Sequence, residues 1–295
     1  MKRGHWQILL AAALFLLALG LTLYPVVSNW YIGRHQSRIQ TEYREVLEQT
    51  DSAEIESIRE SAVAYNKTIT PGAAEEAYSQ ASIRLAAEDY VNQVNVSGSG
   101  IMGYVEIPKI GVDLPIYHGT GADSLDRGTG HLLGSSLPVG GESTHTIITG
   151  HSGMASQKMF TDLEQLREGD IFYLHVLDET LTYEVRKIHT VLPHDTTYLG
   201  IEPGEDLCTL VTCTPTGVNT HRLLVRGHRV NTRESQKHVR VTADATRIDP
   251  IITAPVIALP MLAVLLIWLL VTTRKRPKAG KHEKTTRGDP HETNS

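Results

Sequence analysis

TLVTCTPTGVNTHRLLVRGHR, residues 209–229, contains two apolar runs joined by a loop rich in Thr, Pro, Gly and Asn. Apolar alternation with a period of two predicts β-strands, and a loop of this composition predicts a turn, so the stretch is interpreted as a β-hairpin. Cys213 ends the first run and Arg222 begins the second, with eight residues between them. Because Arg222 alternates with Leu223 and Val225, it is expected on the face opposite that apolar pair. Cys213 and Arg222 can then project into one groove at the loop end.

The pairing of a cysteine with an arginine indicates a nucleophile. A nearby guanidinium favours the thiolate, and it can donate hydrogen bonds to a developing oxyanion or a substrate carbonyl. The alternative is a buried, inert cysteine beside an exposed arginine, which is the usual situation of a free cysteine. Cys208, the other of the two cysteines, should point to the opposite face, with its Cα about 16 Å from that of Cys213. A disulfide requires roughly 4.4–6.8 Å, so both are predicted to be free thiols.

A cysteine enzyme also needs an acid and a base, and the chain has 14 histidines. The preferred candidate is His151, which follows the apolar run 146–149 and lies between Gly150 and Gly153, where a strand end exposes a side chain. The histidines that fit less well, or that the pattern does not exclude, are His145, His221, His118 and His131. The sequence contains no HExxH or CxxC and its histidine spacings are irregular, which disfavours a metal site.

Both ends of the chain carry long uncharged stretches. Residues 7–33 have no charged side chain, and we interpret them as an uncleaved signal anchor rather than a cleaved signal peptide. Residues 251–273 are uncharged and, at about 1.5 Å per residue, long enough to cross a hydrocarbon core of about 30 Å. Four basic residues follow within 274–278, which predicts a cytoplasmic C-terminus. Two spans then place both termini inside and residues 34–250 on the extracellular face.

Between these ends the texture changes from helical to β. Residues 34–66 show apolar spacings of three and four that predict a helix, and Pro71-Gly72 breaks the pattern. The Ser-Gly stretch 97–100 is interpreted as a hinge at the start of the main domain. After it, one short helix is expected at 159–167, and the fold class is mostly β, a closed or nearly closed barrel. Its strands are predicted at 104–107, 144–149, 171–176, 180–191, 207–212 and 223–230. The net charge of −5 and the absence of a basic patch argue against nucleic-acid binding.

Several blocks of residues 100–230 resemble the sortases, which are membrane-anchored cysteine transpeptidases of Gram-positive bacteria. The blocks are GYVEIPKIGVDLPIYHGT, GTGHLLGSSLPVGGESTHTIITGHSG, FTDLEQLREGD and TLVTCTPTGVNTHRLLVRGHR. The C-terminal span and the helical extension resemble the class C, pilus-assembling branch. The organisation expected is a cytoplasmic end and signal anchor (1–33), a helical extension with a possible lid (34–99), a catalytic barrel (100–232), a linker (233–250), a transmembrane helix (251–273) and a cytoplasmic tail (274–295).

The resemblance implies an eight-stranded sortase β-barrel and a role for each of three residues. Cys213 would attack the Thr–Gly carbonyl of an LPxTG-type sorting signal and form a thioacyl intermediate. His151 would protonate the leaving amine and then deprotonate the incoming one, while Arg222 would position the signal and stabilise the oxyanion. The acceptor would be a lysine amine of another pilin subunit, and no metal or organic cofactor would be needed.

The sequence departs from the class C pattern in one segment. Class C enzymes often carry a lid anchored by an Asp-Pro-aromatic motif, and residues 70–88 contain no such tripeptide. Two other functions use the same site: a thiol hydrolase that transfers the acyl group to water, and a sortase that anchors proteins to the cell wall. A third reading is a non-enzymatic, membrane-tethered assembly protein in which Cys213 belongs to the core.

Overall fold

The computed structural model describes residues 2–70, 72–74, 88–154, 157–231 and eight scattered positions (258, 260, 261, 263, 264 and 266–268). The chain divides into two compact units, one of residues 1–24 with 249–295 and one of residues 25–248. Within the described part of the chain, no helix is both long enough and apolar enough to cross a membrane. The spans predicted at 7–33 and 251–273 are therefore not confirmed, and most of 251–273 lies outside the described residues.

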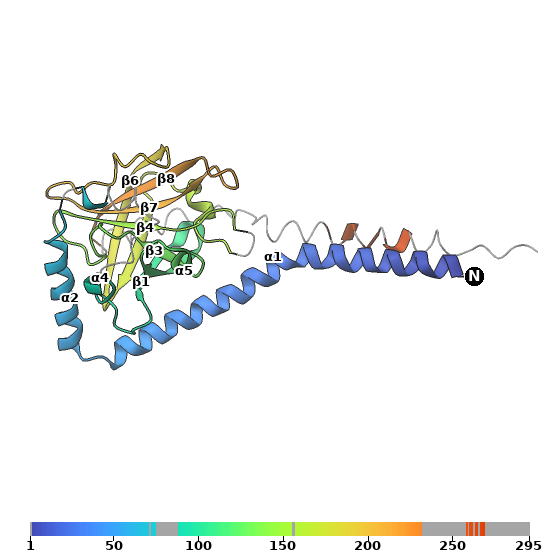
Figure 1. Ribbon diagram of the computed structural model, residues 1–295, viewed down its shortest axis with the longest axis horizontal. Helices are drawn as coiled ribbons and strands as arrows, with labels where there is room; N and C mark the ends of the chain where they lie inside the picture. The colour runs from blue at the N-terminus through green and yellow to red at the C-terminus, as the bar shows by residue number, and fades with distance from the viewer. Residues whose placement is uncertain are drawn as a thin grey trace, which may run out of the picture. The chain divides into compact units, whose positions relative to one another are not determined.

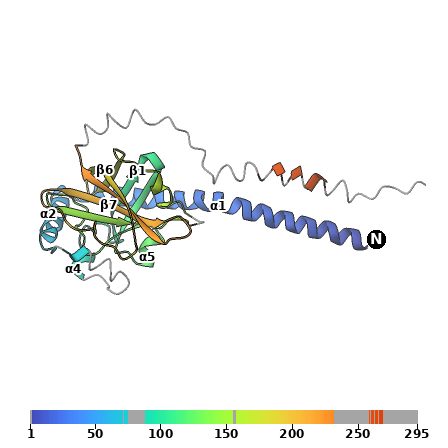
Figure 2. The ribbon, with the colours of Figure 1, turned by 90° about the horizontal axis from the view of Figure 1, so that it is seen from above.

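The second unit contains a closed barrel of eight strands (Figures 1 and 2). The strand order is β1-β2-β3-β4-β7-β8-β6-β5, and β5 closes the barrel by pairing with β1. The β2–β3 and β4–β7 pairs are parallel and the others antiparallel. The strands are β1 (Ile101–Ile107), β2 (Val112–His118), β3 (Thr129–His131), β4 (Thr144–Thr149), β5 (Ile171–Val176), β6 (Glu179–Val191), β7 (Asp206–Thr214) and β8 (His221–Arg229). The expected eight-stranded, mostly β fold is confirmed.

Successive side chains along each strand alternate between the buried interior of the barrel and its outer face. On β7, Cys208 and Leu210 belong to the main core cluster inside the barrel. Val211 lies on the opposite face and packs with a second apolar group, the outer cluster, whose members are Ala74, Leu132, Ile147, Val191, Leu199, Val211 and Leu224. The interior is therefore occupied by packed side chains, and the outer face of β4, β7 and β8 is where polar chemistry can be exposed.

The helical extension consists of two helices, not the single helix predicted from 34 to 66. Two residues, Thr50 and Asp51, separate helix α1 (Lys2–Gln49) from α2 (Ser52–Asn66). Asp51 is the N-cap of α2, and its side chain accepts a hydrogen bond from the backbone of Ala53. A capping aspartate accepts a hydrogen bond from a backbone N–H that has no partner at the start of a helix. A second helix can therefore begin here although the apolar spacing of the sequence continues across the break.

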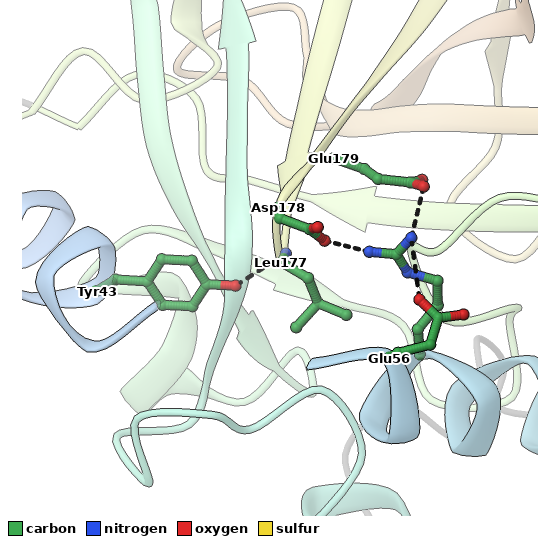
Figure 3. A network of polar contacts seen from close by, with 6 residues as sticks. Tyr43, Glu56, Leu177, Asp178 and Glu179 are labelled. Atoms are coloured by element: carbon green, nitrogen blue, oxygen red, sulfur yellow. Dashed lines mark hydrogen bonds and ion pairs between the residues drawn. The ribbon is translucent and has the colours of Figure 1, made fainter. Parts of the chain in front are cut away.

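Both helices are attached to the turn between β5 and β6 (Figure 3). The Tyr43 hydroxyl donates to the carbonyl of Met102 at 3.1 Å and accepts from the backbone N–H of Leu177 at 3.2 Å. Arg59 of α2 forms ion pairs with Glu179 at 2.6 Å and with Asp178. Burial raises the pKa of Tyr43 to about 12. The helices are therefore held to the barrel by directional contacts as well as by apolar packing.

The segment around 97–100 leads directly into β1, and the residues before it share the barrel's core. Tyr90 of α4 (Glu88–Val91) and Val94 are buried in the main cluster. The Gly100 N–H donates to the side chain of Asn95 at 3.0 Å.

Three further short helices complete the unit: η1 (Pro108–Ile110), α5 (Ala122–Leu125) and η2 (Thr161–Gln165). The last of these is a 3-10 turn where a helix was predicted at 159–167. Of the lid segment 70–88, residues 71 and 75–87 lie outside the described residues.

Candidate active site

Cys213 and Arg222 lie directly opposite each other in the antiparallel ladder of β7 and β8. Directly paired residues project from the same face of a sheet, so the predicted hairpin arrangement is present. The register continues along the ladder, with Val211 opposite Leu224 and therefore on the same outer face. This register places Cys213 and Arg222 side by side at the end of the two strands, on the face of the outer cluster.

His151 reaches the same level from the neighbouring strand β4. The parallel register pairs Thr149 with Val211, and the N–H of Gly150 continues the ladder by donating to the carbonyl of Val211 at 3.0 Å. One residue further, the Ser152 hydroxyl donates to the carbonyl of Cys213 at 2.6 Å. His151 lies between these two links, so β4, β7 and β8 bring His151, Cys213 and Arg222 together. We call these three residues the strand-end site.

The loop that carries His151 has little freedom at its start. A Cβ atom on Gly150 would lie 2.7 Å from the ring of Phe160, which is closer than real Cβ contacts allow. The carbonyl of His151 accepts a hydrogen bond from the N–H of Phe160 at 2.9 Å. The glycine before the histidine is therefore required for the close approach of an aromatic ring, and this packing fixes the backbone of His151.

The two cysteines differ in accessibility, although both are free thiols as predicted. Cys208 is fully buried inside the barrel, and this burial raises the pKa of its thiol well above the usual value. Cys213 is half-buried on the outer face. Because thiolates are the nucleophilic form, only Cys213 has both the access and the partner that a nucleophile needs.

The Arg222 guanidinium is directed to backbone carbonyls rather than to a carboxylate. Its Nη1 donates to the carbonyl of His221 at 3.1 Å and lies 3.4 Å from the carbonyl of Asn219. Among the ion pairs of the described residues, none involves Arg222. Its charge and remaining donors are thus available to a substrate carbonyl or an oxyanion.

The four other histidines considered from the sequence have structural positions. His145 is buried, with one ring nitrogen 2.8 Å from the carbonyl of Gly200 and the other 2.7 Å from the Thr209 hydroxyl. His131 is buried against the Tyr90 hydroxyl at 2.9 Å. Burial lowers the pKa of each of these two imidazoles to about 4. His118 contacts two backbone carbonyls, and His221 pairs with Thr214 on the face opposite Arg222.

The structure adds two carboxylates that the sequence pattern did not single out. The Oδ1 atom of Asp126 lies 3.9 Å from Nε2 of His151. The Thr214 hydroxyl, next to Cys213, donates to Oε1 of Glu164 at 2.5 Å. Asp126 caps the short helix α5 and Glu164 lies in the 3-10 turn η2, and neither position has the alternation or periodicity from which a site residue could be predicted. Among the described residues, no group of three His, Cys, Asp or Glu side chains could hold a metal ion.

Comparison with known proteins identifies the family. The sortase domain model matches residues 105–230. The solved sortase C of Streptococcus pneumoniae is 44% identical, with a TM-score of 0.61 over 66% of this chain and 97% of that one. Sortase C1 of Streptococcus agalactiae is 43% identical, with a TM-score of 0.59 over 66% of this chain and 98% of that one. The chain belongs to the sortase family.

Curated relatives match over a shorter part of their length. Sortase D of Bacillus subtilis (strain 168) is 33% identical over 131 residues, which are 43% of this chain and 63% of that protein. Sortase A of Streptococcus agalactiae serotype III is 29% identical over 45% of this chain and 55% of that protein. This sortase thus spans less than two thirds of either curated relative. Its solved neighbours include several sortase C enzymes, among them a pilus-related sortase C of Group B Streptococcus that is 38% identical.

Proposed function

We propose that this sortase is a membrane-anchored class C transpeptidase that joins pilin subunits. The observation that carries the proposal is the strand-end site, in which three neighbouring strands bring His151, Cys213 and Arg222 to one level of the outer face. A thiol nucleophile, an acid–base group and an oxyanion donor are the parts that acyl transfer from a peptide requires.

The first half-reaction breaks the bond between Thr and Gly of an LPxTG-type signal. The Cys213 sulfur attacks the threonine carbonyl carbon, and Arg222 donates hydrogen bonds to the oxygen that becomes negative. His151 gives its proton to the glycine nitrogen as the C–N bond breaks, and the product is a thioester on Cys213. The buried outer cluster, which includes Val211 and Leu224, packs on the same face of these strands as the strand-end site.

The second half-reaction transfers the acyl group to a lysine amine of another pilin subunit. The amine nitrogen attacks the thioester carbon, His151 accepts its proton, and the C–S bond breaks to release the Cys213 thiolate. The product is an isopeptide bond. Both half-reactions use only side chains of the chain itself. The likeness to class C enzymes supports pilin substrates, and the uncharged stretches 7–33 and 251–273 support a two-pass anchor with the catalytic unit outside the cell.

Product analysis tests this function. Full-length protein in detergent is mixed with an LPxTG peptide and a lysine-containing acceptor peptide, and the products are resolved by mass. The proposal predicts an isopeptide-linked product that the Cys213→Ala variant does not make. Release of the free acid alone, at the same rate with and without the acceptor, would instead identify a thiol hydrolase. The absence of any peptide cleavage would support a non-enzymatic role.

A further inference from the structure

A carboxylate lies beside His151. Asp126 is the C-cap residue of α5 and precedes β3. Its Oδ1 atom is 3.9 Å from Nε2 of His151, and its side chain is 65% exposed. In the barrel, β3 borders β4 on the edge opposite β7. The strand-end site therefore has a negative group, Asp126, next to His151 and its own positive group, Arg222, on the strand beyond Cys213.

The distance between the acid and the imidazole leaves space for a third group. At 3.9 Å the two atoms are too far apart for a direct hydrogen bond, so Asp126 does not hold the imidazole ring by direct contact. A single ammonium nitrogen can lie about 2.8 Å from both atoms at once, because charge-assisted N–H···O bonds are about 2.7–2.9 Å long. One ammonium group can therefore contact both Oδ1 of Asp126 and Nε2 of His151.

We propose that Asp126 is the binding residue for the acceptor amine, which it holds as an ammonium beside His151. The inference rests on the proposed function, since it names the group that recognises the second substrate. A lysine side chain has an unperturbed pKa near 10.4 and arrives protonated at neutral pH. The negative side of the site attracts this charge, whereas the Arg222 side repels it. The amine therefore approaches the thioester from the side of Asp126 and not from the side of Arg222.

The chemistry balances with two proton transfers. The bound ammonium loses one proton to solvent and becomes a neutral amine that still contacts Asp126. Its nitrogen attacks the thioester carbon, its second proton moves to Nε2 of His151, and the C–S bond breaks to leave the Cys213 thiolate. Asp126 itself neither gains nor loses a proton.

Two neighbouring side chains support the assignment. Nε2 of Gln157 donates to the backbone carbonyl of Asp126 at 2.9 Å, which ties the loop after His151 to the acid. Oε1 of the same amide is buried and has no hydrogen-bond partner among the described residues, so it is a spare acceptor next to Asp126. The adjacent cation does not neutralise the acid: Arg127 donates to the carbonyl of Asp123, and its guanidinium lies 4.3 Å from the centre of the Tyr117 ring.

The exposure of Asp126 sets the size of the effect. Ion pairs between exposed groups typically contribute about 0.2–1 kcal/mol, and 1 kcal/mol corresponds to about a fivefold change in an equilibrium constant. Screening by salt weakens such pairs, since the Debye length falls to about 3 Å at 1 M ionic strength. The contribution of Asp126 should therefore be several-fold, specific for cations and sensitive to salt.

The test uses full-length enzyme in detergent, first acylated with an LPxTG peptide. The second-order rate constant for decay of the thioacyl enzyme is measured with a lysine-containing peptide and with hydroxylamine, a nucleophile that is uncharged at neutral pH. Asp126→Asn should lower the constant for the lysine peptide about three- to fivefold and leave that for hydroxylamine and the acylation rate unchanged. High salt should remove the difference. Asp126→Glu keeps the charge and should retain most of the activity, and Glu142→Gln, an exposed acid before β4 at its other end, is the matched control.

Two results would overturn the assignment of Asp126. Equal losses with both nucleophiles would mean that the acid acts through His151, and an unchanged lysine rate would mean that it does not meet the amine. Failure of the wild-type protein to form a thioacyl enzyme at all would overturn the proposed function, and this inference with it. The acylation measurement separates that case from a specific failure of Asp126.

Discussion

The hydroxyl of Thr214 donates a 2.5 Å hydrogen bond to the Glu164 carboxylate, which ties the end of β7 to the 3-10 turn η2. Thr214 is buried and immediately follows Cys213, so this contact fixes the end of β7 next to the candidate nucleophile. A hydrogen bond to a charged group contributes about 1.5–3 kcal/mol. We expect Thr214→Val to lower the free energy of unfolding by about 1.5 kcal/mol and Thr214→Ser to restore most of it, as measured by denaturant unfolding. Equal stability of the valine and serine variants would show that the contact contributes nothing.

The two cysteines should respond differently to substitution and to alkylation. Cys213→Ala is expected to abolish thioacyl formation with little change in stability, because the thiol is on the outer face. Cys208→Ala should keep full chemistry but lose about 1 kcal/mol of stability, because it removes a buried sulfur from the core. Iodoacetamide should label Cys213 alone in the folded protein. Loss of catalysis in a folded Cys208→Ala variant would contradict the assignment of faces.

Catalysis should require the planar guanidinium of Arg222 and the imidazole of His151. Arg222→Lys and His151→Ala are each expected to lower turnover on the order of 10²–10³, the usual effect of losing an oxyanion donor or an acid–base group. His221→Ala is the matched control, since its side chain projects from the other face of β8. The measurement is kcat/KM for an LPxTG peptide. Full activity of the lysine variant would mean that net charge alone is sufficient.

Stability should fall as the pH is lowered through the range below 6.5, because two buried histidines are neutral in the folded state. Burial lowers the pKa of His145 to about 4, whereas an unfolded chain takes up the proton near pH 6.5. The unfolded state then binds more protons between these values, so the stabilisation is complete above pH 6.5 and is lost progressively down to about pH 4. His131 behaves likewise. Urea unfolding at pH 7.5 and pH 5 should show the loss, and His145→Gln should have a smaller pH dependence; an unchanged slope in that variant would contradict the assignment.

The attachment of the helical extension should depend on the Tyr43 hydroxyl. Tyr43→Phe leaves the N–H of Leu177 and the carbonyl of Met102 without this partner, and a buried unsatisfied group costs about 1–3 kcal/mol. Thermal unfolding should therefore occur at a lower temperature than in the wild type. Tyr65→Phe is the control, since no hydrogen bond of its hydroxyl is seen among the described residues. A similar decrease in both variants would exclude a specific role for the Tyr43 contacts.

Much of the barrel could be predicted from the sequence because six strands alternate clearly. The predicted runs 144–149 and 171–176 coincide with β4 and β5. Two strands were missed: β3 has only three residues, and β2 contains Pro115, which cannot donate to a ladder and weakens the strand pattern. The helix break at Asp51 was missed because a cap can interrupt a helix without interrupting its apolar periodicity.

The candidate site could be predicted only as far as local pattern reaches. The hairpin brings Cys213 opposite Arg222, and its spacing is visible in the sequence. The parallel pairing of β4 with β7 places His151 beside them. The sequence pattern only favoured His151 among 14 histidines, and the family resemblance implied that it acts together with Cys213 and Arg222. Asp126 and Glu164 were not found, because their proximity to His151 and Thr214 depends on the conformation of loops, which cannot be predicted from apolar periodicity.

Intact-mass spectrometry of the full-length protein mixed with an LPxTG peptide, without an acceptor amine, tests most directly whether Cys213 is the nucleophile. We expect a mass increase equal to the acyl part of the peptide, which ends at its threonine. Proteolysis should localise this adduct to Cys213, and hydroxylamine should remove it. The adduct should be absent from Cys213→Ala and present in Cys208→Ala. An unmodified Cys213 in folded protein that still cleaves the peptide, or an adduct on another residue, would contradict the assignment of Cys213 as the nucleophile.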